Sequence, residues 1–203
     1  MWVRPPPFAP RENVSDHLFR LGRWGDTGSA HEFFHGNTYA QQATSTGAPR
    51  LEIAPKSPLP LFLKLADALS PPFDILYVLH TSRCDSELGR YQSPPLDKDT
   101  FGAFASEFAT FFAADGRHDV WFHGRDPEGT LVWDRHNLIY VYGNLDRFTE
   151  VLQANGLIEG EVSVPVPHTH HYHARFDDHE RRILKHFEWA RTPLQPSDVQ
   201  YPL

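Results

Sequence analysis

Cysteine is nearly absent from this chain, since Cys84 is the single thiol among 203 residues. One thiol forms no disulfide within the chain and supplies too few sulfur ligands for a structural zinc or iron–sulfur site. Long apolar runs are also missing, because Pro60 and Lys64 interrupt the longest of them, Leu59–Leu65. A membrane-spanning helix needs roughly 20 consecutive apolar residues, so the sequence predicts no such span.

The first residues, Met1–Pro10, lack the apolar stretch of a secretory signal, and three successive prolines prevent the helix that such a signal forms. Together with the shortage of cysteine, this favours a soluble protein in the reducing cytoplasm.

Excess positive charge is absent as well. The chain holds 19 Lys and Arg against 26 Asp and Glu, a formal net charge of −7. Nucleic acids and anionic membrane surfaces attract basic patches, so neither is an expected partner. Residues 1–70 carry 7 basic and 6 acidic side chains, whereas residues 71–203 carry 12 and 20, so the acidity belongs to the second part.

Familiar catalytic signatures are missing too. The sequence contains no G-x-S-x-G motif, no G-x-x-x-x-G-K-[ST] phosphate-binding loop and no G-x-G-x-x-G after a predicted strand. Serine hydrolysis of the common type and nucleotide-driven chemistry are therefore not expected, and no residue is identified as catalytic on this basis.

Prolines and glycines divide the chain into three parts. Residues 1–57 are predicted to form an irregular arm, with one strand at Arg50–Ala54, that packs on the main domain of residues 58–191. A polar, proline-containing tail follows over residues 192–203.

Hydrophobic periodicity predicts the elements of the main domain. Helices are expected after Ser57 and after Asp99, the latter with Phe101, Phe104, Phe108 and Phe111 on one face. A third helix is expected between its cap Asn144 and Gly156, which fits the C′ position just beyond the helix. The last is expected from Asp177, with Glu180 completing a capping box. The predicted extended segments are Phe73–His80, Asp119–His123, Thr130–Trp133, Leu138–Tyr142 and Glu161–His173. The order after the arm and a first helix is β-α-β-β-β-α-β-α, which predicts an α+β fold with a single mixed or antiparallel sheet and helices mainly on one face.

Histidine is the residue in excess, with 13 copies, four of which lie within His168–His173. In an extended segment His168 and His170 share one face, and His171 and His173 share the other. Two imidazoles on one face of a strand can bind one divalent metal ion such as zinc, manganese or iron. A third ligand would come from His118, His123, His136, Asp134 or Asp177. The alternative is a polar strand edge whose imidazoles form hydrogen bonds or stack on Tyr172.

A second histidine motif, His31-Glu32-Phe33-Phe34-His35, matches the H-E-x-x-H pattern of zinc proteases. That pattern requires a helix, yet glycines lie close on both sides of the motif. The context therefore argues against a protease. Cys84, with His80 and Arg83 nearby, is interpreted as an ordinary free thiol, because Asp85 opposes the formation of a thiolate.

Two hypotheses of function follow. The first is a small protein-binding module, such as an immunity or inhibitor protein whose acidic surface neutralises a basic toxin or enzyme. Its predicted contact residues lie in the loop Gly89–Pro95 and the turn Asp134–Asn137, and they are Arg90, Tyr91, Asp134, Arg135 and His136. The second is a metal-dependent hydrolase or oxygenase that uses His168, His170, His171 and His173. The oligomeric state is left open.

Overall fold

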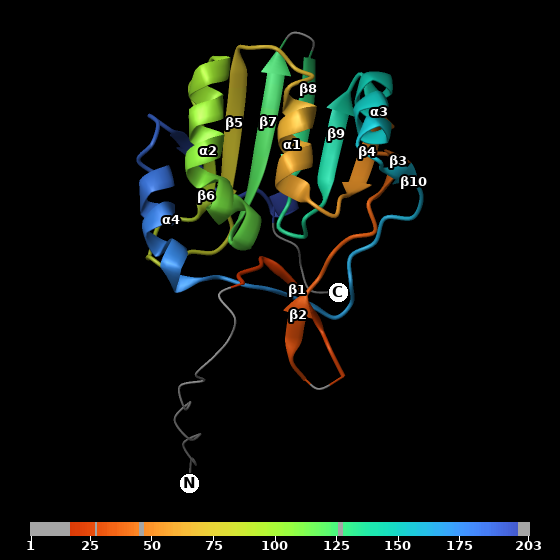
Figure 1. Cartoon of the computed structure of the whole chain (residues 1–203). Helices are drawn as coiled ribbons and strands as arrows, with labels where there is room; N and C mark the ends of the chain where they lie inside the picture. Colours follow the sequence, from red (N-terminus) through yellow and green to blue (C-terminus); the bar gives the residue numbers. More distant parts are fainter. Residues whose placement is uncertain (1–16, 27, 45–46, 126–127, 199–203) are drawn as a thin grey trace.

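The computed structural model describes residues 17–26, 28–44, 47–125 and 128–198. These residues form the predicted α+β fold, but their strands lie in two sheets (Figure 1). The larger sheet has nine strands in the order β10-β3-β4-β9-β8-β7-β5-β6-β12, and the smaller has three in the order β11-β1-β2. The expectation of a single sheet is wrong, because the small sheet is built from the arm and from the histidine-rich segment.

Both sheets combine strands from distant parts of the chain. The strands of the large sheet are β3 (Thr38–Ala43), β4 (Pro49–Ala54), β5 (Phe73–Leu79), β6 (Gly89–Gln92), β7 (His118–Arg125), β8 (Glu128–Trp133), β9 (Ile139–Gly143), β10 (Ile158–Glu159) and β12 (Ala190–Thr192). Those of the small sheet are β1 (Leu21–Trp24), β2 (Ala30–Glu32) and β11 (His168–His170). Neighbouring strands are antiparallel except β10 and β3, which makes the large sheet mixed.

Helices α1 (Pro58–Ala66), α2 (Lys98–Ala114) and α3 (Leu145–Ala154) cover one face of the large sheet, and α4 (Asp177–Ile183) packs beside α2 (Figure 1). The phenylalanine stripe of α2 was correctly predicted, since Phe104, Phe108 and Phe111 are buried in the core and Phe101 packs against it. The hydrophobic face of this helix therefore fixes the layer that lies on the sheet. None of the helices in the described ranges combines the length and apolar character needed to cross a membrane.

Three local predictions need correction. Part of the predicted loop Gly89–Pro95 is strand β6, because it pairs with β5 on one side and β12 on the other. The cap of α2 is Asp97 rather than Asp99, and its side chain accepts a hydrogen bond from the backbone of Thr100 at 2.7 Å. Glu180 does not close a capping box, since its carboxylate contacts Arg117 instead.

The arm is more regular than the sequence indicated. It contributes β1 and β2 to the small sheet and β3 and β4 to the large one, where only the strand at Arg50–Ala54 was expected. Residues 1–16 of the predicted arm and residues 199–203 of the predicted tail lie outside the described residues. The segment Glu161–His173 is a strand only at His168–His170.

Candidate metal centre

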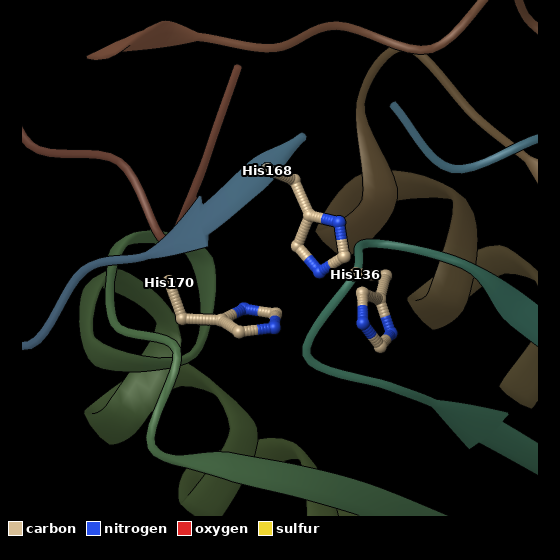
Figure 2. A group of neighbouring side chains, drawn as sticks. All are labelled: His136, His168 and His170. Atoms are coloured by element: carbon tan, nitrogen blue, oxygen red, sulfur yellow. The ribbon is translucent and has the colours of Figure 1, made fainter. Parts of the chain in front are cut away.

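The side chains of three histidines from two distant parts of the chain converge (Figure 2). His168 and His170 project from β11, and His136 projects from the turn between β8 and β9. Each contributes one ring nitrogen, and these nitrogens all lie within 4.8 Å of one another. His168 and His170 share a face as the two-residue period of a strand predicts, and His136 was among the predicted third ligands.

The small sheet holds β11 in place. It pairs with β1 so that His170 lies opposite Leu21 and His168 lies opposite Arg23. The next residue, His171, accepts a hydrogen bond through its carbonyl from the backbone N–H of Gly116 at 2.9 Å. A Cβ atom at Gly116 would lie 2.9 Å from the carbonyl oxygen of Arg20 and 3.3 Å from the Cβ of His170. The glycine therefore permits the close approach that brings β11 to the end of α2.

The hydrogen bonds of two of these rings leave a lone pair free for a metal. His136 Nδ1 lies 2.9 Å from Asp134 Oδ2, and His168 Nδ1 lies 2.9 Å from the carbonyl oxygen of Pro165. A carboxylate or a carbonyl only accepts hydrogen bonds, so in the neutral imidazole each Nδ1 carries the proton. The Nε2 atoms of His136 and His168 then carry lone pairs, in the arrangement typical of histidines that bind metals.

The ring of His170 is also in the neutral form that a metal ligand requires. Burial, followed by the nearby His136 and Arg135, lowers the pKa of His170 to about 3. Its ring is therefore neutral at physiological pH, and a neutral imidazole is the form that coordinates a metal. Its Nδ1 is buried and has no hydrogen-bond partner among the described residues. Unlike His136 and His168, His170 therefore has no hydrogen bond at Nδ1 that fixes its tautomer.

The geometry is compatible with zinc after a small adjustment. Zinc binds imidazole nitrogens at about 2.0–2.1 Å, so two tetrahedral ligands lie about 3.4 Å apart. The three nitrogens, at most 4.8 Å apart, would have to approach one another by no more than about 1.4 Å. The rings meet edge to face, with centroids 4.8 to 5.3 Å apart, so no ring covers another. Imidazole suits zinc or iron better than manganese, which prefers oxygen ligands.

His171 and His173, the other two predicted ligands, do not belong to this group. The ring of His171 packs against Phe19 at a centroid distance of 4.5 Å, and His173 Nε2 donates to the Phe19 carbonyl at 3.0 Å. Both rings therefore help to attach the histidine-rich segment to the arm. Of the other predicted third ligands, Asp134 accepts a hydrogen bond from His136 and orients its ring. The remaining three make separate contacts. The ring of His118 packs against two phenylalanines, His123 forms a hydrogen bond with Thr130, and Asp177 forms an ion pair with Arg117.

The H-E-x-x-H motif forms no helix and no zinc site. His31 and Glu32 end strand β2, and His31 lies across β1 from β11, about 10 Å away at the spacing of two strands. His35 is buried, which lowers the pKa of its ring, and its Nε2 donates to the carbonyl of His136 at 2.8 Å. The second histidine of the motif therefore supports the turn that carries His136.

Cys84 has none of the features of an activated nucleophile. Burial first, and then the charges of Glu180 and Asp177, raise the pKa of its thiol. The Sγ atom lies 3.3 Å from the carbonyl oxygen of Asp177. A raised pKa lowers the fraction of reactive thiolate, which agrees with the interpretation of an ordinary free thiol.

The residues predicted to contact a protein partner are largely inside the molecule. Arg90 forms an ion pair with Asp198 at 2.6 Å, and the side chains of Tyr91, Asp134 and His136 are buried. Arg135 is half-buried. Binding of a protein partner therefore stays a prediction without a defined surface.

A cavity of about 400 Å³ opens beside the turn that carries His136. Its lining includes His35, Trp133 and Asn137, together with Glu32 and Phe34 from the arm. The cavity mixes apolar walls with a few polar groups, as pockets for small molecules do. Asn137 follows His136 in the sequence, so the cavity and the three-histidine group share this turn. None of the three histidines is part of the cavity lining.

Comparisons with known proteins add no further information, since no family model, curated protein or solved structure matches the chain.

For a zinc ion held by these three histidines, Asp134→Asn is expected to weaken binding by about 10- to 100-fold, the usual effect of losing a hydrogen-bond partner of a ligand histidine. The asparagine oxygen can still accept from the backbone N–H groups of His136 and Leu138, as Asp134 Oδ1 does at 2.9 Å each. Its NH₂ group would then face His136 Nδ1 and favour the tautomer with a proton on Nε2, where the metal should bind. Competition with a zinc chelator measures the affinity, and an unchanged affinity in a folded variant would contradict this role.

Proposed function

We propose that the protein is a metal-dependent enzyme, most readily a hydrolase, that binds one zinc ion through His136, His168 and His170. The observation that supports this most is the pair of hydrogen bonds from His136 to Asp134 and from His168 to Pro165, which leave both Nε2 atoms free to bind. A chance contact of three histidines would not require these orienting partners.

The number of ligands favours a catalytic rather than a structural centre. Structural zinc sites usually have four protein ligands, whereas catalytic sites have three and leave one position for water or substrate. Within the described ranges, the group contains three ligands and no cysteine. Zinc bound in this way would act as a Lewis acid and lower the pKa of bound water to about 7.

The proposal is tested by titrating the metal-free protein with zinc in a calorimeter and with cobalt(II) in a spectrophotometer. We expect one metal ion per chain and the visible absorption of tetrahedral cobalt. Azide, a small monoanion, is then added to the cobalt protein, and a change in the spectrum is expected because one position is open. Failure to bind one metal ion, or a spectrum that azide leaves unchanged, would overturn the proposal.

A further inference from the structure

Arg23 lies directly beside the metal centre. In the β1–β11 pair, the N–H of His171 donates to the carbonyl of Arg20 at 3.0 Å, and the N–H of Trp24 donates to that of Pro167 at 3.4 Å. Because hydrogen-bonded pairs alternate with non-hydrogen-bonded ones, Arg23 and His168 form a non-hydrogen-bonded pair. Their Cα atoms are then about 4.5 Å apart, and both side chains emerge on the same face of the sheet.

Arg135 is the residue before His136 in the turn between β8 and β9. Its backbone N–H donates to Asp119 Oδ1 at 2.8 Å, and its positive charge acts on the ring of His170. Arg23 is exposed and Arg135 is half-buried. Among the described residues, the guanidinium of Arg23 has no hydrogen-bond or ion-pair partner, and that of Arg135 interacts with Asp119 through charge, without a hydrogen bond to it. Two arginine side chains therefore remain available at the rim of the centre.

The net positive charge around the centre favours an anionic ligand. A divalent metal on three neutral imidazoles keeps both of its positive charges, and Arg23 and Arg135 add two more. Asp134 supplies one negative charge through His136. Asp119 lies 2.8 Å from His80 and also interacts with Arg135 and with the buried Arg20, whose own positive charge acts on His170. Uncompensated charge that is partly removed from water is unfavourable, so a ligand with two negative charges is favoured over a neutral one. This positive site stands out in a chain whose net charge is −7.

We propose that the metal centre binds the phosphate group of a phosphate monoester, with one oxygen on the metal and the others held by Arg23 and Arg135. This inference rests on the proposed function and names its substrate class. A phosphate monoester has three terminal oxygens, enough for the metal and for two guanidinium groups, whereas a carboxylate has only two. Arginine is also well suited to bind such oxygens in a bidentate manner.

The test uses the cobalt(II) form of the full chain, with inorganic phosphate as the probe and the visible spectrum as the readout. Phosphate is expected to change the spectrum, and Arg23→Ala and Arg135→Ala are each expected to weaken its binding about tenfold or more, the effect of losing a charge-assisted hydrogen bond. Arg147→Ala, an exposed arginine on α3, is the matched control and is expected to bind as the unchanged protein does. Azide binding should change much less than phosphate binding in all three variants.

The results separate this inference from the proposed function. If cobalt and azide bind but phosphate does not, or if the arginine variants bind phosphate like the control, the phosphate site is overturned and the metal centre stands. If acetate binds as tightly as phosphate, the preference for a dianion is overturned. If cobalt itself does not bind, both proposals are overturned. Circular dichroism and thermal unfolding establish that each variant is folded before the titrations.

Discussion

The double variant His168→Ala with His170→Ala is expected to lose stoichiometric zinc binding. It removes two of the three imidazoles, and His136 alone cannot hold the ion against a chelator. A ligand that binds only the folded state stabilises it by about 2.7 kcal/mol when present at one hundred times its Kd. The unchanged protein should therefore unfold at a higher temperature with zinc than without it, and the double variant should show no such difference. Elemental analysis after dialysis gives the zinc content.

His171→Gln is the matched control for this experiment. His171 belongs to the same histidine-rich segment, but its ring packs against Phe19 on the opposite side from the metal centre. This variant should therefore retain one zinc ion per chain and the stabilisation that zinc produces, even if the metal-free form is less stable. Equal zinc contents in the double variant and the control would contradict the assignment of the ligands.

Glu180→Ala is expected to produce the largest loss of stability, about 3–5 kcal/mol, the usual effect of removing one member of a buried ion pair. Arg117 is fully buried and contacts three carboxylates, those of Asp115, Asp177 and Glu180. Loss of Glu180 would leave part of this positive charge without compensation. Chemical denaturation measures the free energy of unfolding. Asp178→Ala, an exposed acidic residue on the same helix, should change it by no more than about 0.5 kcal/mol.

The same network gives a pH dependence with a definite sign. Burial by itself raises the pKa of Glu180, but hydrogen bonds from Ser82, Ser86 and Arg117 outweigh it, so the pKa is lowered overall. The folded state then favours the ionised carboxylate, and this contribution is present above the ordinary pKa of glutamate, about 4.3. It is lost as the pH falls below that value. If Glu180→Ala lowers the free energy of unfolding by less than about 1 kcal/mol at neutral pH, the network does not stabilise the fold.

This network also positions the segment that carries two of the three clustered histidines. The carboxylate of Asp115 accepts from the backbone N–H of His173 at 2.8 Å, and Arg117 donates to the carbonyl of His173 at 3.1 Å. Both bonds hold the chain just after β11. The buried charges therefore connect α4 and the end of α2 to the strand that carries His168 and His170.

Local patterns in the sequence by themselves determined the elements with a strong hydrophobic period. Helix α2 follows from the spacing of its phenylalanines, and the start of α3 follows from Asn144, whose side chain accepts from Arg147 N at 3.3 Å. Gly156 has a φ of 75° just past the end of α3, as its predicted position after the helix requires. The shared face of His168 and His170 also follows from local geometry, because alternate residues of any strand point to the same side.

Only the tertiary structure decided which side chains meet. Nothing in the local sequence pairs β11 with β1, and this pairing places Arg23 beside His168. His136 was one of five possible third ligands, and the chain path through the β8–β9 turn selected it. The arm was predicted as irregular because prolines and stretches of glycine, serine and threonine interrupt its hydrophobic pattern. Strands as short as β1 and β2, of four and three residues, are stable only when they pair with other segments. Periodicity describes how a segment is buried, whereas the partner of a segment depends on contacts between residues far apart in the chain.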